Sequence, residues 1–203
     1  GKQHVEAAAE KIGFPVILKH NRAGKGLGVK LLLSLEGLRE HLASEEYEDS
    51  VDGIFLAQQY IEAPEPFITR VEFVGGRLLY AVRVDTSQGF ELCPADVCQV
   101  GDVASACPAV APADKFQIAR EFQHPLIPAW EAFLAANDVG IAGIEFIVDA
   151  DGRAYTYDVN TNTNYNPDAE AKDGRRGMGA AAAYFGKLLS AEYGGRHGLS
   201  SAA

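Results

Sequence analysis

The sequence is poor in cysteine and lacks any long apolar run. Its three cysteines, Cys93, Cys98 and Cys107, are an odd number and do not form the dense framework of a disulfide-stapled secreted domain. We therefore expect free thiols in a reducing cytosol. The alternative, a zinc site, needs a fourth ligand, and the nearest candidate is the distant His124. No segment approaches the roughly 20 apolar residues that span a bilayer, and no signal peptide is visible. These absences predict a cytoplasmic protein without a membrane partner.

Basic residues are also scarce. The formal net charge of −10 argues against a nucleic-acid-binding protein that works through a basic surface. It does not exclude a nucleotide, because one or two cations in a cleft, together with a metal ion, override the global balance locally. The apolar fraction of 47% is that of an ordinary globular protein, and 203 residues suit one domain or two small subdomains. The chain starts at Gly1 inside an amphipathic pattern, without an initiator Met, so we expect a piece of a longer protein.

Periodicity predicts an α+β chain with mainly antiparallel sheet, because hairpins are segregated from helices. Helices are expected over residues 5–12, 35–42 and 178–193, and a kinked helix or two helices over 114–137. Strands are expected over 16–19, 29–33, 54–61, 68–74, 77–84, 143–149 and 153–160. Loops are expected over 85–112 and 161–176, and a frayed tail over 194–203.

The first stretch that carries chemistry is LKHNRAGKGLGVKL. It lacks the spacing of a P-loop, and a strand follows it where a P-loop needs a helix, so it predicts a flap between two antiparallel strands. Gly24, Gly26 and Gly28 let backbone N–H groups approach phosphate oxygens, and Lys19 and Lys25 supply positive charge. The competing interpretation is a long mobile hairpin with incidental lysines.

The second stretch is LAQQYIEAPEPF. On a strand, Gln58 and Tyr60 point one way, and Gln59 and Ile61 point the other. An adenine needs backbone N–H and C=O groups at its edge and apolar walls on its faces, and an interrupted strand supplies both. Ordinary exposed glutamines on a strand that leaves the sheet are the alternative.

Two arginines occupy successive strands around the hairpin signal Gly75-Gly76. Arg70 precedes the turn and Arg83 follows it, and we expect their side chains to share a face. Unrelated surface arginines are the competing interpretation.

The third stretch is GIEFIVDADGRAYTYDVN. A two-residue turn at Ala150-Asp151 places Glu145 opposite Thr156 and diagonal to Asp158, with Asn160 on the same face. Tyr155, Tyr157 and Val159 are then expected on the other face. Two carboxylates and an amide on one surface suit Mg²⁺ or Mn²⁺ held jointly with phosphates. A one-residue slip turns Glu145 away, and a polar hairpin face is the alternative.

These three stretches, in this order, resemble the ATP-grasp superfamily over roughly residues 5–165, and within it RimK-like glutamate ligases and glutathione-synthetase-like enzymes. The resemblance implies two subdomains with mainly antiparallel sheets gripping ATP. It divides the chain into a small subdomain over 1–60 and a large one over 61–193. The superfamily's N-terminal domain, with part of the substrate site, is expected to be missing from this chain.

The resemblance also implies site residues. Lys19 contacts the α- and β-phosphates, the backbone of Gln59 and Ile61 holds the adenine, and Gln58 binds its amino group. Tyr60 completes this hinge, and either Glu65 or Glu62 binds ribose. The metal ligands implied are Glu145, Asp158, which bridges two ions, and Asn160. The catalytic residues implied are Arg70 and Arg83, which stabilise the transferring phosphoryl group or the acylphosphate.

The activity implied is ATP- and Mg²⁺-dependent ligation. A substrate carboxylate, from a small molecule or a peptide, becomes an acylphosphate that an amine attacks. Gln58 stands where an acid is frequent in the superfamily, and RVDTSQGFELCPADVC matches no substrate signature. A phosphotransferase acting on a hydroxyl and a non-catalytic nucleotide-binding module are the alternatives. Thr161–Asn166 is expected to be a loop bordering the acceptor site, with solvated asparagines as the competing interpretation.

Overall fold

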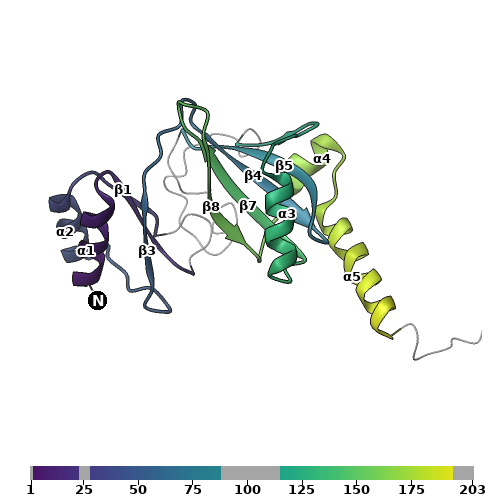
Figure 1. The fold of residues 1–203 in the computed structure, drawn as a ribbon, viewed down its shortest axis with the longest axis horizontal. Coiled ribbons are helices and arrows are strands. Elements are labelled where there is room, and N and C mark those ends of the chain that lie inside the picture. The colour runs from purple at the N-terminus through teal and green to yellow at the C-terminus, as the bar shows by residue number, and fades with distance from the viewer. Residues whose placement is uncertain (1, 23–27, 88–114, 194–203) are drawn as a thin grey trace, which may run out of the picture. The chain divides into compact units, whose positions relative to one another are not determined.

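The computed structural model describes residues 2–22, 28–87 and 115–193 (Figure 1). They form two compact units. Unit 1 contains the residues through Pro64, and unit 2 contains Glu65–Asp85 and the residues from 115 onward. Most of the loop expected at 85–112 and all of the tail expected at 194–203 lie outside the described residues. Within these ranges, no helix is both long and apolar enough to cross a membrane.

Unit 1 is a three-stranded antiparallel sheet covered on one face by two helices. The helices are α1 (Lys2–Ile12) and α2 (Leu35–Ala43). The strands are β1 (Val16–His20), β2 (Lys30–Leu32) and β3 (Phe55–Gln59), in the order β2-β1-β3. Because β1 and β2 pair antiparallel, the glycine-rich segment joins two antiparallel strands, as the sequence predicts.

Local signals and one apolar cluster determine this arrangement. Gly13 at φ +90° ends α1, and the side chain of Ser34 accepts a hydrogen bond from the Gly37 N–H at the start of α2. Apolar side chains of both helices and the sheet then pack together: Val5, Ala9, Val16, Leu18, Leu32, Leu38 and Leu42. The helices therefore cover the face that carries Val16 and Leu18.

Asp52 ties the turn before β3 to the end of β1. Its carboxylate accepts from the Ser50 hydroxyl at 2.7 Å, from the Ile54 N–H at 3.0 Å and from the Asn21 amide at 2.9 Å. These donors, the Asn21 amide first, lower the pKa of Asp52 to about 2. Asn21 directly follows β1, so Asp52 links the end of β1 to the start of β3.

This link predicts a local loss of stability in acid. Because the pKa of Asp52 is lower in the folded chain than its ordinary value of 3.8, its contribution is present above pH 3.8 and disappears as the pH falls toward about 2. The protection factor of the Ile54 amide in hydrogen exchange should therefore fall across this interval. Asp52→Asn should remove the pH dependence, and a wild-type protection factor that stays constant would contradict the assignment.

Unit 2 is a five-stranded antiparallel sheet with three helices. The strands are β4 (Phe67–Val74), β5 (Arg77–Asp85), β6 (Phe116–Ala119), β7 (Ile141–Val148) and β8 (Ala154–Asn160), in the order β6-β5-β4-β7-β8. The helices are α3 (Ile127–Ala136), α4 (Pro167–Asp173) and α5 (Gly177–Tyr193). The strands β4, β5, β7 and β8 and the helix α5 match the sequence prediction closely.

Two elements of unit 2 differ from the prediction. Residues 116–119 form the edge strand β6 and not helix, because they pair with β5. The segment expected to be a loop after β8 contains α4. The sequence contains signals for both ends of this helix. The Asn166 side chain accepts from the Ala169 N–H at 2.9 Å, and Pro167 follows it at the first helical position. Gly174 ends the helix at φ +69°.

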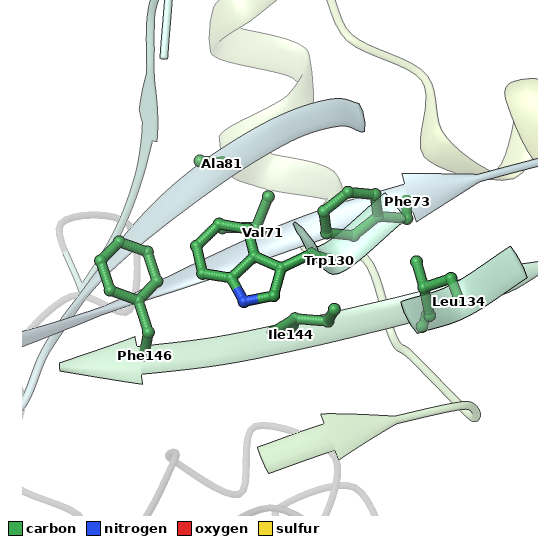
Figure 2. Close-up of a cluster of buried hydrophobic side chains, with 8 residues drawn as sticks. Val71, Phe73, Ala81, Trp130, Leu134, Ile144 and Phe146 are labelled. Carbon is green, nitrogen blue, oxygen red and sulfur yellow. The ribbon is translucent and has the colours of Figure 1, made fainter. Parts of the chain in front are cut away.

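The core of unit 2 lies between α3 and one face of the sheet (Figure 2). Trp130 of α3 lies between Phe73 and Phe146, with ring centroids 6.4 and 5.1 Å away. Its Nε1–H donates to the Thr156 hydroxyl of β8 at 2.9 Å. The remaining members of the cluster are Val71, Ala81, Leu134, Ala142 and Ile144. The opposite face of the sheet carries the polar side chains of Arg70, Glu72 and Glu145.

Candidate functional site

In unit 1, the expected nucleotide residues of β1 and β3 lie on the sheet face opposite the helices. Val16 and Leu18 point into the core, so the alternating Lys19 points to the other face. Gln58 shares that face because it pairs with Ile17, whose neighbours Val16 and Leu18 are in the core. The structure thus brings Lys19 and Gln58 to one surface.

The other expected nucleotide residues of unit 1 are distributed around this sheet. Gln59 pairs with Val16, and the Tyr60 N–H donates to the Pro15 carbonyl at 3.3 Å beyond the end of β3. Ile61 follows in the connecting segment. Gly28 has φ +70°, a backbone conformation that favours glycine. Gly24, Lys25 and Gly26 lie outside the described residues.

In unit 2, the hairpin of β7 and β8 places two carboxylates directly opposite each other. Glu145 pairs with Asp158, and Gly143 pairs with Asn160 two residues further along. Paired residues of an antiparallel ladder share a face, so the Glu145, Asp158 and Asn160 side chains lie on one surface. That surface is the face opposite α3, because Ile144 and Phe146 point into the core.

The register differs from the prediction in two ways. The turn is longer, since the Asp149 N–H donates to the Arg153 carbonyl at 3.0 Å and residues 150–152 form the loop. A bulge then leaves Tyr157 without a ladder partner, so Phe146 pairs with Thr156 and Glu145 with Asp158. The expected pairing of Glu145 with Thr156 is therefore wrong, and Asp158 is opposite Glu145, not diagonal to it.

The bulge also reverses the expected direction of Tyr157. Its hydroxyl donates to Glu145 Oε2 at 2.9 Å, so its side chain reaches the carboxylate face. Burial, followed by the charge of Glu145, raises the pKa of Tyr157. Tyr157 thus remains a hydrogen-bond donor that fixes the Glu145 side chain.

Arg70 lies beside these carboxylates. It pairs with Glu145 across β4 and β7, and its Nη1 atom is 3.7 Å from Glu145 Oε1. Its Nε–H donates to Glu72 Oε1 at 2.7 Å. Its Nη2–H donates to the Thr163 hydroxyl, which in turn donates to Glu72 Oε2 at 2.7 Å. Arg70, Glu72 and Thr163 therefore form a closed ring of hydrogen bonds next to Glu145.

Arg83 does not share the Arg70 face. It pairs with Thr69, which pairs in turn with the core residue Phe146. Its guanidinium lies 3.7 Å from the centroid of the Phe67 ring and donates to Glu65 at 3.0 Å. The expectation of a common face was wrong. Successive side chains of a strand point to opposite faces, and the bulge between Glu72 and Phe73 shifts the pairing by one residue, so Arg83 lies opposite Thr69.

Sequence reasoning missed three residues of this surface. Glu72 lies two positions after Arg70, so strand alternation alone places them on one face, and that signal was available. Gly143 is needed because a Cβ there would meet Arg70 Nε at 2.8 Å and the Thr163 hydroxyl at 3.0 Å. Thr163 carries no local signal, since it reaches Glu72 from a loop 91 residues away.

The asparagines in and beside the loop after β8 have different roles. The Asn160 side chain accepts from the Asn162 N–H at 2.8 Å, and Asn166 caps α4. Tyr165 between them is 8% exposed and packs against Tyr80. Burial first, and then the nearby carboxylates, raise the pKa of Tyr165 to about 12. Asn162 and Asn164 are exposed, and a substrate contact by these two residues stays a prediction.

The polar face suits a divalent cation. It carries the carboxylates of Glu72, Glu145 and Asp158 beside the Arg70 guanidinium, and carboxylate oxygens are the hard ligands that Mg²⁺ prefers. Glu145 and Asp158 are direct cross-strand partners on β7 and β8. Their role as metal ligands stays a prediction, as does that of Asn160.

The comparisons with known proteins agree with this geometry. No family model matches the chain. A D-alanine–D-alanine ligase of Halorhodospira halophila is 28% identical over 153 residues, which are 74% of this chain and 45% of the ligase. The chain thus spans less than half the length of this curated relative.

Solved structures extend the likeness to nearly the whole chain. The biotin carboxylase domain of Hydrogenobacter thermophilus 2-oxoglutarate carboxylase, complexed with MgADP, has a TM-score of 0.58 at 18% identity, over 91% of this chain and 39% of that one. A RimK domain ATP-grasp protein of Sphaerobacter thermophilus has a TM-score of 0.54 at 20% identity, over 91% and 58%. The chain therefore has the ATP-grasp fold. The α+β class and the resemblance to ATP-grasp ligases are confirmed.

Proposed function

We propose that the chain is the nucleotide- and metal-binding part of an ATP- and Mg²⁺-dependent carboxylate–amine ligase. The observation that carries the proposal is the cross-strand pair Glu145–Asp158, with Arg70 Nη1 3.7 Å from Glu145. The ATP-grasp fold and the similarity to a D-alanine–D-alanine ligase support it.

The proposed reaction has two steps, formation of an acylphosphate and its attack by an amine. A substrate carboxylate oxygen attacks the γ-phosphorus of ATP, the bond to the β-γ bridging oxygen breaks, and ADP leaves. The resulting acylphosphate is then attacked at its carbonyl carbon by an amine, which loses a proton as inorganic phosphate departs. Chemistry of this kind depends mostly on positioning and on electrostatic stabilisation.

The polar face of unit 2 has the groups that the first step needs. Glu145, Asp158 and Asn160 would hold the cation, and the cation would offset the charge of the nucleotide phosphates. Asp158 would be the shared ligand if two ions bind. Arg70 provides a fixed positive charge beside them. Arg83, on the other face, instead holds Glu65, the candidate ribose ligand, through their ion pair.

Unit 1 provides the nucleotide residues. In this proposal Lys19 binds phosphate and Gln58 binds the adenine amino group. Their common position on the face opposite the helices supports these roles. The backbone around Gln59–Ile61 borders the adenine, and the glycine-rich segment that contains Gly28 covers the phosphates. Substrates of the same chemistry as those of RimK-like or D-alanine ligases fit this proposal: a small or peptide carboxylate and an amine.

The proposal is tested with the complete protein, because the chain spans only part of its relatives. Saturating ATP and Mg²⁺ with a panel of carboxylic acids, including amino acids and short peptides, should release ADP for the substrate acid. Hydroxylamine should trap the activated acid as a hydroxamate. ADP release with a phosphorylated alcohol as product would indicate a phosphotransferase instead. Nucleotide binding without ADP release from any acid would overturn the ligase assignment.

A further inference from the structure

Unit 1 contains a cavity that the proposed function does not use. It lies between the first two turns of α1, the strand β3 and the segment before β3, and Val5, Leu18 and Phe55 are among the residues that line it. Its volume is about 600 Å³, within the range of roughly 300–1,000 Å³ that small-molecule sites occupy. The cavity is therefore large enough for a ligand with one or two rings.

The cavity is on the helix-covered side of the sheet, opposite the proposed nucleotide surface. Leu18 and Ala57 line it and are cross-strand partners, and Leu18 belongs to the apolar cluster under the helices. Lys19 and Gln58 each follow one of these residues along their strands, so their side chains point to the other face. The cavity is therefore separate from the residues proposed to bind the nucleotide.

Small residues and one aromatic pair give the cavity its shape. Ala8 and Ala57 leave space that longer side chains would fill. A Cβ at Gly53 would meet no atom of the described residues within 4 Å, its chain neighbours aside. Tyr47 and Phe55 are the aromatic part of the wall, stacked with ring centroids 5.6 Å apart and an angle of 18° between the planes. Walls of this kind favour a flat apolar body, because its burial removes apolar surface from water.

The segment that borders the cavity is strongly acidic. Residues 45–53, EEYEDSVDG, contain five carboxylates and no lysine or arginine, and the polar residues that line the cavity are His4, Tyr47 and Asp49. Burial first, and then the charge of Asp49, raises the pKa of Tyr47, so the phenol stays a neutral donor near this carboxylate. The ammonium group of Lys2 lies 4.4 Å from the centroid of the Tyr47 ring, so these surroundings already stabilise one ammonium group. A ligand with an amine therefore complements this segment, and a ligand with a phosphate or carboxylate does not.

We infer that this cavity binds a small organic amine with an aromatic body. The aromatic part packs against Leu18, Ala57 and Phe55, and the ammonium group faces Asp49 in the acidic segment. The inference goes beyond the proposed function, since it uses neither the nucleotide surface of unit 1 nor the carboxylate face of unit 2. The ligand is therefore bound without ATP, Mg²⁺ or a substrate acid.

The test uses tryptamine as the probe. Calorimetric titration of the complete protein, without nucleotide or Mg²⁺, measures its dissociation constant. Tryptophol carries the same ring with a neutral hydroxyl, and indole-3-propionate carries it with a carboxylate. Tryptamine should bind roughly 10-fold more tightly than tryptophol, the gain expected from a hydrogen bond to a charged group, and indole-3-propionate should bind most weakly. Equal affinities, a preference for the carboxylate, or no saturable binding of tryptamine would overturn the inference.

A pair of α1 variants locates the binding. Ala8 and Ala7 are both exposed, but only Ala8 is among the residues that line the cavity. Ala8→Trp fills the cavity and should raise the dissociation constant of tryptamine by roughly 10-fold or more, because the indole of the ligand loses its place against the wall. Ala7→Trp adds the same bulk outside the cavity and should leave the constant within about twofold of the wild type. Equal constants for the two variants would place the amine elsewhere and overturn the inference.

A second pair of variants tests the charge without adding bulk, and it decides alone if Ala8→Trp does not fold. Asp49→Asn should bring the dissociation constants of tryptamine and tryptophol to within about twofold of each other, because the carboxylate that faces the ammonium group is lost. Glu48→Gln removes the neighbouring charge, which does not line the cavity, and should keep the preference for the amine. An Asp49→Asn protein that keeps the full preference would overturn the inference. Because no titration contains ATP, such a failure leaves the proposed ligase function untouched.

Discussion

Asp158→Asn is expected to lower ligation by roughly 100-fold or more while leaving the fold intact. The change removes one of the two carboxylates that face each other across β7 and β8. The cation that we propose for this pair would contribute several kcal/mol to charge stabilisation in phosphoryl transfer. Asp158 is half-buried on a polar surface and outside the core cluster, so the free energy of unfolding should change by about 1 kcal/mol or less. Steady-state ADP release and thermal unfolding measure the two effects.

The matched control is Asp151→Asn, at an exposed aspartate in the turn of the same hairpin. It makes the same chemical change away from the carboxylate pair, so ADP release should stay within about twofold of the wild type. Equal activity of the Asp158→Asn protein and the control would remove the metal role from Asp158. It would also favour a module in which nucleotide binding serves no catalysis.

Trp130→Ala is expected to destabilise unit 2 by about 3–5 kcal/mol, the range for deleting a large buried aromatic side chain. The indole is 5% exposed and packs against Phe73 and Phe146. It also stacks on His124, with ring centroids 5.4 Å apart, and the burial there lowers the pKa of His124. Denaturant unfolding followed by far-ultraviolet circular dichroism measures the loss.

Phe133→Ala provides the comparison on the same helix. Phe133 is 48% exposed, so its deletion removes little buried area and should lower the free energy of unfolding by about 1 kcal/mol or less. Similar losses for the two variants would mean that α3 does not use Trp130 as its main anchor to the sheet. A second consequence of Trp130→Ala is loss of the hydrogen bond to Thr156, two residues before Asp158.

Sequence patterns predicted elements where local signals and burial agree. The helices at 5–12 and 35–42 were predicted from their spacing and end signals, and Gly13 and Ser34 do end and begin them. β6 was missed because its four residues become a strand only through pairing with β5, and a contact of that kind leaves no local pattern. α4 was missed for a different reason. Asn166, Pro167 and Gly174 are signals of helix ends, but the polar composition of the segment led to the prediction of a loop.

The candidate site was predictable in composition but not in geometry. Residue types at strand spacing indicated Glu145, Asp158 and Asn160, and the register does bring them to one face. The prediction placed them on that face with the wrong pairing. The residues of the turn indicate neither the three-residue loop nor the bulge. Arg83 was grouped with Arg70 by proximity in sequence, although only pairing decides which face a strand residue takes.

The bulge at Tyr157 divides the β7–β8 hairpin into two parts with different pairing registers. Beyond it, Glu145 and Asp158 are fixed by the neighbouring strand β4, which pairs with Glu145 through Arg70. Before it, the tip around residues 149–153 has its own register and its own hydrogen bonds through Asp149. Relatives can therefore lengthen, shorten or decorate this tip without displacing the carboxylates, and variation in length is expected to accumulate there first.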